Sequence, residues 1–315
     1  MNAINGKVIL ITGGTGSFGR WMTKELLKHD IKEIRIYSRD EEKQLDMRRE
    51  FEDKRVKFII GDVRDYNRLL EATRSVNLLF HAAALKIVPM CEQHVLEALK
   101  TNTFGTWYVR RAVIENNVQK SILISTDKAV KPINLYGMTK AIAEKIWISN
   151  EFETKSKFAV VRYGNVIGSR GSVIPYFKQL IKENKPLVIT HPDMTRFHIT
   201  LQQAADLICW TTENMQGGEI VVPKIPACNI MELAKVMTAE NYPLKIIGVR
   251  EGEKIHECLV QEDEFRRLKE TDKYYIIYPY GQYYSGKIRE EFTSQNAQQL
   301  SRKEIANLLK ESGWL

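Results

Sequence analysis

The chain has 315 residues, of which 43% are apolar and 27% are charged. This length and composition fit a globular protein that can bury a substantial core, and they exclude global disorder and a fibrous repeat. No apolar run approaches the ~18 residues that a membrane span needs, and the apolar stretch at 7–12 is too short for the core of a signal peptide. We therefore expect a cytoplasmic protein with no membrane partner.

The charged residues and the cysteines indicate which kinds of ligand the protein binds. The formal net charge is +8, but Lys and Arg are spread along the chain among 39 acidic residues, which favours anionic small molecules over nucleic acid. The cysteines lack the paired spacing of a zinc site, so we expect free thiols and no metal. They are Cys91, Cys209, Cys228 and Cys258.

The first predicted strand, KVILIT at 7–12, leads into a glycine-rich loop. Its apolar, β-branched residues are typical of a buried parallel strand. Glycines at every third position then let the backbone turn, approach a pyrophosphate and pack a helix predicted at 18–28 against the sheet. A glycine-rich turn without a ligand is the alternative, but the flanking strand and helix favour a dinucleotide site. The cofactor residues predicted here are Gly13, Thr15, Gly16, Ser17, Phe18 and Gly19.

The second predicted strand, EIRIYS at 33–38, bears on the choice between NAD and NADP. An acidic residue at its end would bind a ribose 2′-hydroxyl and repel a 2′-phosphate. Ser38 and Arg39 stand there instead, and a hydroxyl with a guanidinium suits the extra phosphate, so we predict NADP. Asp40 is expected to cap the helix that begins near Glu41.

Strand-like segments at 56–65, 77–86 and 121–126 alternate with helical stretches, which predicts an α/β fold with a Rossmann-type doubly wound parallel sheet. Ligands of such sheets gather beyond the carboxyl ends of the strands. We expect Asp62 and Val63 to border an adenine and the small residues after the fourth strand to let the cofactor pass, with simple loop packing as the alternative. The further predicted cofactor residues are Ala82, Ala83, Ala84, Lys86 and Asn102.

The stretch STDKAVKPINLYGMTK at 125–140 holds the predicted catalytic groups. Asp127 and Lys128 follow the fifth strand, where the nicotinamide is expected; a solvated surface ion pair is the alternative. Tyr136 and Lys140 are four residues apart in a predicted helix and share one face. The charge of Lys140 would lower the pKa of Tyr136 from about 10 toward neutrality. Such a phenolate can take a hydroxyl proton while hydride leaves the same carbon, which is alcohol oxidation by NADP.

The motifs GGTGSFG, HAAALK, STDK and YGMTK, in this order and spacing, resemble the extended short-chain dehydrogenase/reductase family. Within that family the chain is similar to the UDP-N-acetylglucosamine 4,6-dehydratases that invert C5 and begin pseudaminic acid biosynthesis. The similarity covers nearly the whole chain, through segments such as RYGNVIGSRGSVIPYF (162–177), TRFHIT (195–200) and REGEKIHE (250–257). Tyr136 favours this soluble inverting branch, because some C5-retaining relatives carry Met at that position.

The resemblance implies that Tyr136 takes the 4-hydroxyl proton as hydride passes to NADP, which acidifies the hydrogen on C5. Lys128, if desolvation makes it a neutral amine, would take that hydrogen, and Asp127, if kept protonated, would donate to the departing 6-hydroxyl. The division of these two roles stays open. Thr126 would orient the 4-hydroxyl. Hydride return to C6 and reprotonation of C5 from the opposite face would give UDP-2-acetamido-2,6-dideoxy-β-L-arabino-hex-4-ulose and regenerate the tightly bound NADP.

We predict an NADP-binding domain at 1–165, to which some later segments return, and at 166–315 mainly a smaller C-terminal substrate-binding lobe. A final amphipathic helix is expected within LSRKEIANLLKES (300–312). The resemblance implies a UDP-sugar as partner and a homo-oligomer, either a dimer or a hexamer. The implied substrate-binding residues are Lys86, Asn165, Ser172, Val173, Thr190, Arg196, Arg250 and Glu253.

Two other kinds of function stay open. A UDP-hexose 4-epimerase or another NADP-dependent sugar-nucleotide enzyme needs Tyr136 and the cofactor but not Asp127 and Lys128. An NADP-sensing protein that has lost catalysis is the alternative outside the enzymes. The sequence leaves open whether the product enters pseudaminic acid, capsule or O-antigen synthesis.

Overall fold

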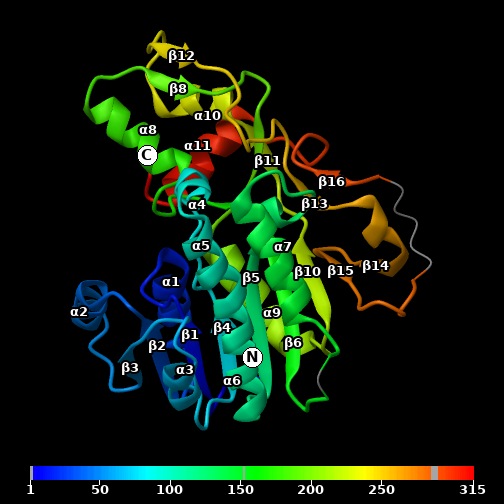
Figure 1. The fold of residues 1–315 in the computed structure, drawn as a ribbon. Helices are drawn as coiled ribbons and strands as arrows, with labels where there is room; N and C mark the ends of the chain where they lie inside the picture. The colour runs from blue at the N-terminus through cyan, green and yellow to red at the C-terminus, as the bar shows by residue number, and fades with distance from the viewer. Residues whose placement is uncertain (1–2, 152, 285–289) are drawn as a thin grey trace.

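A nine-stranded sheet forms the centre of the protein in the computed structural model, which describes residues 3–151, 153–284 and 290–315 (Figure 1). Its parallel strands stand in the order β3-β2-β1-β4-β5-β6-β10, and β15 and β14 add an antiparallel edge beside β10. The strands are β1 (Val8–Thr12), β2 (Glu33–Ser38), β3 (Val56–Ile60), β4 (Leu78–His81), β5 (Lys120–Thr126), β6 (Lys157–Tyr163), β10 (Glu219–Pro223), β14 (Leu268–Glu270) and β15 (Tyr274–Ile277).

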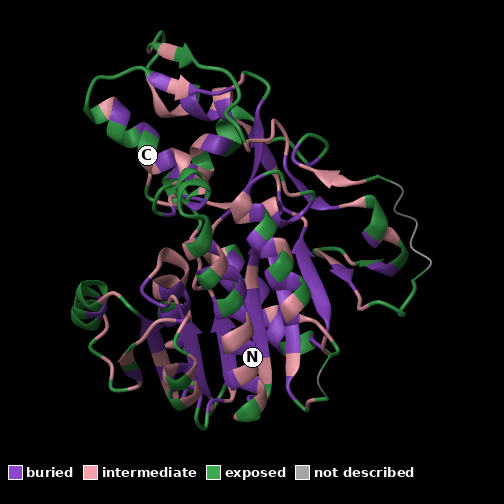
Figure 2. Ribbon diagram, in the orientation of Figure 1, coloured by how far each residue is buried: buried purple, intermediate pink, exposed green. Residues whose placement is uncertain are grey.

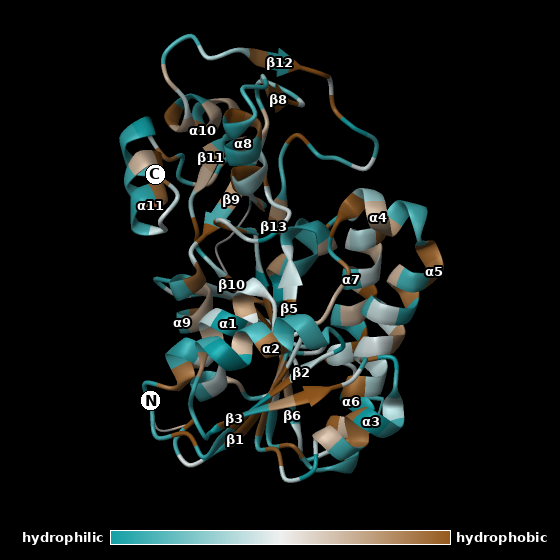
Figure 3. Cartoon of the chain, turned by 90° about the vertical axis from the view of Figure 1, so that its left-hand side faces the viewer, coloured by the Kyte–Doolittle hydropathy of each residue, from teal (hydrophilic) through white to brown (hydrophobic). Residues whose placement is uncertain are grey.

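Helices cover both faces of this sheet, which confirms the predicted doubly wound α/β fold (Figures 1 and 3). One layer holds α1 (Ser17–Leu26), α2 (Glu41–Glu50) and α9 (Leu201–Asn214), and the other holds α3 (Tyr66–Ala72), α6 (Gly105–Glu115) and α7 (Leu135–Trp147). The strands between them are buried along most of their length, as Figure 2 shows. Burial on both faces explains why the strands read as continuous apolar runs rather than as alternating ones.

Short polar side chains fix where several helices begin. The Asp40 carboxylate accepts a hydrogen bond of 2.9 Å from the Lys43 backbone N–H, so the predicted cap of α2 is confirmed. In the same way Asn134 caps α7 by accepting from the Gly137 N–H at 2.8 Å. These caps place the first turn of each helix at the carboxyl edge of the sheet.

A helical run leads from the end of β4 to the opposite edge of the sheet. It consists of α4 (Val88–Gln93), α5 (Val95–Ala98), a π-helical turn (Leu99–Phe104) and then α6. A π-helical turn inside such a run is often found at functional sites.

The smaller lobe lies beyond the carboxyl ends of the parallel strands and has its own apolar core (Figure 1). It is built from α8 (Val173–Lys182), α10 (Ile230–Met237) and α11 (Arg302–Glu311), with the strand pair β8 (Leu187–Ile189) and β12 (Leu244–Ile246). The predicted final helix is therefore confirmed as α11. Short strands join the lobe to the sheet: β7 (Asn165–Val166), β9 (Thr195–Ile199), β11 (Ala227–Asn229), β13 (Cys258–Val260) and β16 (Phe292–Thr293).

The chain after residue 165 contributes to both parts, since β10, β14, β15 and α9 belong to the main sheet and its covering layer. The domain boundary at 165 stays a prediction. In the described residues, no helix has the length and apolar character needed to cross a membrane. The four cysteines are buried free thiols, and the described residues hold no group of three or more His, Cys, Asp or Glu side chains suited to a metal.

Candidate active site

A cavity of about 1360 Å³ lies where the carboxyl ends of the parallel strands meet the smaller lobe. A site for one drug-sized ligand occupies roughly 300–1,000 Å³, so this cavity has room for more than one small molecule. Most of the predicted site residues line it: Gly13, Thr15, Gly16, Ser17, Phe18, Ser38, Arg39, Asp62, Val63, Ala82, Ala83, Ala84, Lys86, Thr126, Lys128, Tyr136, Lys140, Asn165, Ser172, Val173, Thr190, Arg196, Arg250 and Glu253. Three predicted residues, Gly19, Asn102 and Asp127, lie behind its wall.

The glycine loop forms one end of the cavity. Gly13 has a φ of +65°, and a Cβ there would lie 2.8 Å from the backbone of Ala83, so no larger residue fits. Gly19 serves the helix packing that was predicted for this glycine pattern. A Cβ at Gly19 would lie 2.2 Å from the Gly14 carbonyl oxygen, so this glycine lets α1 pack on the loop and does not face the cavity.

The end of β2 presents the residues on which the cofactor prediction depends. The Ser38 hydroxyl is hydrogen-bonded to that of Thr15 at 2.9 Å, which ties the strand end to the glycine loop. Arg39 is 55% exposed, and its guanidinium lies 3.7 Å from the Asp62 carboxylate. The structure therefore brings these predicted residues together on one wall of the cavity.

Asn102 does not line the cavity, and its contact with the cofactor stays a prediction. Asn102 is 1% exposed, and its side chain makes hydrogen bonds with the backbone of the loop after β4. Its amide donates to the Leu85 carbonyl at 2.8 Å and to the Thr139 hydroxyl at 3.0 Å, and its oxygen accepts from the Leu85 N–H at 2.8 Å. Asn102 holds the loop that carries Ala84 and Lys86.

A glycine sets how closely α7 approaches the end of β5. After β5 the chain makes a short turn at 127–129, capped by the Thr126 hydroxyl, which accepts from the Lys128 N–H at 3.4 Å. A Cβ on Gly137 would lie 2.2 Å from the Lys128 carbonyl oxygen. Gly137 therefore lets the first turn of α7, with Tyr136, lie directly against the Asp127–Lys128 turn.

The predicted effect of Lys140 on Tyr136 is wrong in this structure. Burial raises the pKa of Tyr136 to about 12, and the groups that oppose this rise are the Lys128 charge and a hydrogen bond with Thr126. Lys140 donates from Nζ to the Ile124 carbonyl at 2.7 Å, and burial lowers its own pKa to about 8. Lys140 is thus engaged by the backbone of β5, and Lys128 is the cation that favours the phenolate.

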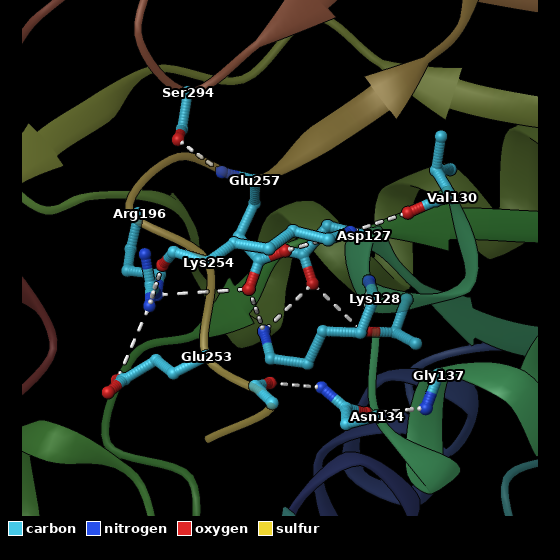
Figure 4. Close-up of polar contacts among 12 residues, drawn as sticks. Asp127, Lys128, Val130, Asn134, Gly137, Arg196, Glu253, Lys254, Glu257 and Ser294 are labelled. Carbon is cyan, nitrogen blue, oxygen red and sulfur yellow. Dashed lines mark hydrogen bonds and ion pairs between the residues drawn. The ribbon is translucent and has the colours of Figure 1, made fainter. Parts of the chain in front are cut away.

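Lys128 lies between two carboxyl groups, as Figure 4 shows. Its Nζ lies 3.1 Å from Asp127 Oδ1 and 3.0 Å from Glu257 Oε1. Burial disfavours the ammonium, but the two carboxyl groups outweigh burial and raise the pKa of Lys128. The expectation that desolvation makes this lysine a neutral amine is therefore wrong for the structure as it stands.

Asp127 is completely buried behind Lys128 rather than on the cavity wall. Burial raises its pKa, which is the predicted direction for an acid that keeps its proton. Its Oδ2 has no hydrogen-bond partner among the described residues. The burial also rules out the solvated ion pair that was the alternative for Asp127 and Lys128.

Two residues of the lobe complete this cluster, and only one of them was predicted. Arg196 lines the cavity, but its guanidinium donates to the Thr195 and Ile255 carbonyls at 2.7 and 3.0 Å, so it also holds the backbone that leads to Glu257. The Glu257 side chain is 3% exposed and lines the cavity. The segment REGEKIHE contains it, but nothing in the local pattern distinguishes Glu257 from the other glutamates there.

Comparison with known proteins fixes the family. Residues 9–279 match the family model described as "Polysaccharide biosynthesis protein". The chain belongs to this family. Within the extended short-chain dehydrogenases/reductases, it falls in the branch of the inverting UDP-N-acetylglucosamine 4,6-dehydratases. The inverting dehydratase of Campylobacter jejuni strain 81-176 is 48% identical, over 87% of this chain and 84% of that protein.

Other proteins that are similar to this chain have names that do not describe a dehydratase. A UDP-glucose 4-epimerase of Rickettsia bellii is 44% identical, over 96% of this chain and 95% of that protein. An uncharacterized membrane protein of Methanocaldococcus jannaschii is 41% identical, over 100% of this chain and 98% of that protein. The crystal structure of Pen from Bacillus thuringiensis superposes with a TM-score of 0.92 at 36% identity, covering 98% of this chain and 99% of that one. Family membership therefore indicates a sugar-nucleotide dehydratase or epimerase.

Proposed function

We propose that this protein is an NADP-dependent, C5-inverting UDP-N-acetylglucosamine 4,6-dehydratase. The observation that carries the proposal is the acid and amine pair, Asp127 and Lys128, packed against Tyr136 at the cavity. Epimerisation at C4 needs the tyrosine and a nicotinamide but has no use for this pair, whereas dehydration needs both an acid and a base beyond C4. The 48% identity to a relative named as an inverting dehydratase supports the same conclusion.

When bound between the glycine loop and the ends of the strands, NADP would supply the hydride acceptor for C4 and the hydride for C6. The backbones of Gly13 and Ala83 lie so close together that no Cβ fits between them. A loop without side chains there fits a pyrophosphate, because the phosphates can approach the backbone N–H groups. Ser38 and Arg39 would hold the 2′-phosphate by charge-assisted hydrogen bonds. These contacts support NADP over NAD as the cofactor.

The chain's own residues move the protons. Thr126 orients the 4-hydroxyl, and Tyr136 accepts its proton once it is a phenolate, which the charge of Lys128 favours and burial opposes. With a ketone at C4, the hydrogen on C5 becomes acidic. Because Lys128 lines the cavity and Asp127 lies behind it, we assign contact with C5 and the 6-hydroxyl to Lys128. Asp127 would exchange protons with the sugar only through Lys128 Nζ, 3.1 Å away.

The lobe side of the cavity offers groups for a UDP-sugar. Lys86 and Arg250 supply positive charge for a diphosphate, and the N-terminus of α8 at Ser172 and Val173 offers backbone N–H groups. Asn165, Thr190 and Glu253 offer polar atoms to the sugar and ribose. We also propose a homo-oligomer, a cytoplasmic location and a product that enters pseudaminic acid synthesis.

The test is to incubate the protein with UDP-N-acetylglucosamine in deuterated water and to follow the product by NMR. We expect a 4-keto-6-deoxy sugar with deuterium at C5 and the L-arabino configuration. A product with the D-xylo configuration would contradict inversion but not dehydration. Absence of any 4-keto product would contradict the dehydratase proposal and favour a protein that binds NADP without catalysis.

A UDP-hexose 4-epimerase is the second candidate, because relatives with that name match 96% of this chain at 44% identity. The substitution Lys128→Met separates the two functions. In this variant an epimerase would lose the charge that favours the Tyr136 phenolate and would be slower, but it would still interconvert UDP-glucose and UDP-galactose, whereas a dehydratase would lose water elimination altogether. Tyr136→Phe is the matched control, since it should abolish both reactions.

A further inference from the structure

Glu257 is a buried carboxylate on the cavity wall that the proposed mechanism has not used. Oε1 lies 3.0 Å from Lys128 Nζ and 3.9 Å from Arg196 Nε. Oε2 lies 3.7 Å from Lys254 Nζ and has no hydrogen-bond partner among the described residues. Figure 4 shows the carboxylate above the Lys128 ammonium, on the side opposite Asn134.

The backbone holds Glu257 rigidly in this place. Its N–H donates to the Ser294 hydroxyl at 2.9 Å, and its carbonyl accepts from the Ser294 N–H at 2.8 Å. The side chain therefore projects from a fixed point just before β13 toward the turn that follows β5. A carboxylate fixed so close to one amine is preorganised to exchange a proton with it.

The two carboxyl groups beside Lys128 differ in the direction of their pKa shifts. Burial raises the pKa of Asp127, which disfavours its ionised form. Burial acts in the same direction on Glu257, but the charges of Lys128, Arg196 and Lys254 outweigh it and lower the pKa. The shifts therefore favour the ionised form of Glu257 more than that of Asp127, so Glu257 is the carboxylate more available to take a proton.

The proposed reaction needs a proton acceptor beside Lys128. Lys128 can remove the C5 hydrogen only as a neutral amine, yet its neighbours keep it an ammonium. The proton that blocks it must go to a nearby acceptor. Of the charged and titratable groups around it, Arg196 and Lys254 are cations, burial lowers the pKa of His198 to about 4, and Tyr136 faces C4. Burial raises the pKa of Asp127, which lies behind Lys128 and away from the cavity wall.

We propose that Glu257 is a positioning residue that holds Lys128 and accepts its proton, so that Lys128 can act as the base at C5. The inference rests on the proposed function. The proton passes from Nζ to Oε1, and the N–H bond breaks as the O–H bond forms. Nζ then takes the C5 proton and gives it to the departing 6-hydroxyl, which leaves as water. After hydride reaches C6, C5 takes a proton from solvent on the opposite face. Glu257 then returns its proton to Nζ, so both residues finish the cycle as they began it.

The test is Glu257→Gln, which keeps the shape and one hydrogen bond but cannot take a proton. Two steps are followed at once: formation of reduced cofactor at 340 nm, which reports oxidation at C4, and deuterium incorporation at C5. We expect C5 exchange to fall by about 10²-fold or more while C4 oxidation stays within about threefold of the wild type. Reduced cofactor should therefore accumulate in the variant.

A pH series distinguishes proton transfer from a merely structural role. In Glu257→Gln the Lys128 proton must leave to solvent, so C5 exchange should rise by about tenfold per pH unit from pH 7 until Lys128 is neutral. The wild type should show no such rise. Glu257→Asp should restore part of the exchange, because it supplies an acceptor again at a longer distance.

Glu253→Gln is the matched control, since Glu253 also faces Arg196, at 3.5 Å, but makes no contact with Lys128. We expect this variant to slow both steps alike through weaker substrate binding. Equal slowing of both steps in Glu257→Gln, or normal C5 exchange with a flat pH profile, would overturn the inference. If the wild type oxidises C4 but never exchanges C5, the proposed function is wrong and the inference falls with it, whereas the variant results alone leave the proposed function standing.

Discussion

The contact between Gly137 and Lys128 makes a sharp prediction about how the active site is positioned. In Gly137→Ala the new Cβ would lie 2.2 Å from the Lys128 carbonyl oxygen, and this distance must grow by about 1.2 Å to reach the 3.4 Å of ordinary contact. The neighbouring atom belongs to the backbone, so it cannot rotate away. Either α7 or the turn at 127–129 must move, and Tyr136 moves relative to Lys128.

A misplacement of about 1 Å costs on the order of 10²-fold in rate, or about 2.7 kcal/mol of transition-state stabilisation. Overpacking should also lower the free energy of unfolding by about 1–3 kcal/mol. The assay is kcat for formation of the 4-keto product, with thermal unfolding measured on the same samples. The matched control is Met138→Ala, the next residue of α7, whose side chain is 45% exposed and which should leave both quantities nearly unchanged.

The reasoning is refuted if Gly137→Ala keeps kcat within about threefold and unfolds at the wild-type temperature. A large loss of stability with normal kcat would show that α7 can shift without disturbing the catalytic groups. Either result would mean that the close approach does not set the distance between Tyr136 and Lys128.

Three further predictions concern the cofactor, the core and acid stability. Arg39→Asp should shift the ratio of NADP to NAD affinities by at least about tenfold toward NAD, because a carboxylate repels a 2′-phosphate. Titration calorimetry measures both affinities, and an unchanged ratio would contradict the assignment of Arg39 to the 2′-phosphate. Arg162→Met leaves the buried Glu144 and Glu264 carboxylates facing each other, which costs about 3–5 kcal/mol. Thermal unfolding of the variant should show this loss of stability, and an unchanged unfolding temperature is the contrary result. Burial lowers the pKa of His81 to about 3, so the stability that the neutral imidazole contributes is complete above pH 6.5. As the pH falls below 6.5, up to about 1.4 kcal/mol of that stability is lost per pH unit. The unfolding temperature of His81→Gln should therefore change less steeply with pH between pH 6.5 and 5.

Much of the framework could be predicted because it depends on local patterns. The strand at Glu33–Ser38 has the predicted ends, and Asp40 caps the next helix as a short carboxylate at that position should. The glycine spacing predicted the position of the cavity, because a glycine-rich turn between a strand and a helix is typical of a dinucleotide site. Asn102 and Gly19 belong to the predicted region, but they lie behind the cavity wall rather than on it. Their orientation depends on which backbone segments pack beside them, and a single sequence does not contain that information.

The amino-acid sequence by itself determined the doubly wound sheet, the edge at which ligands gather, and the proximity of Tyr136 to Lys128. Strand periodicity, helix caps and glycine positions are properties of neighbouring residues, so they can be read along the chain. Only the tertiary structure decided the charges of the catalytic groups. Glu257 comes from a distant segment and raises the pKa of Lys128, and burial raises the pKa of Asp127. A pKa is set by every charge and dipole within a few ångströms, and those neighbours are chosen by the fold.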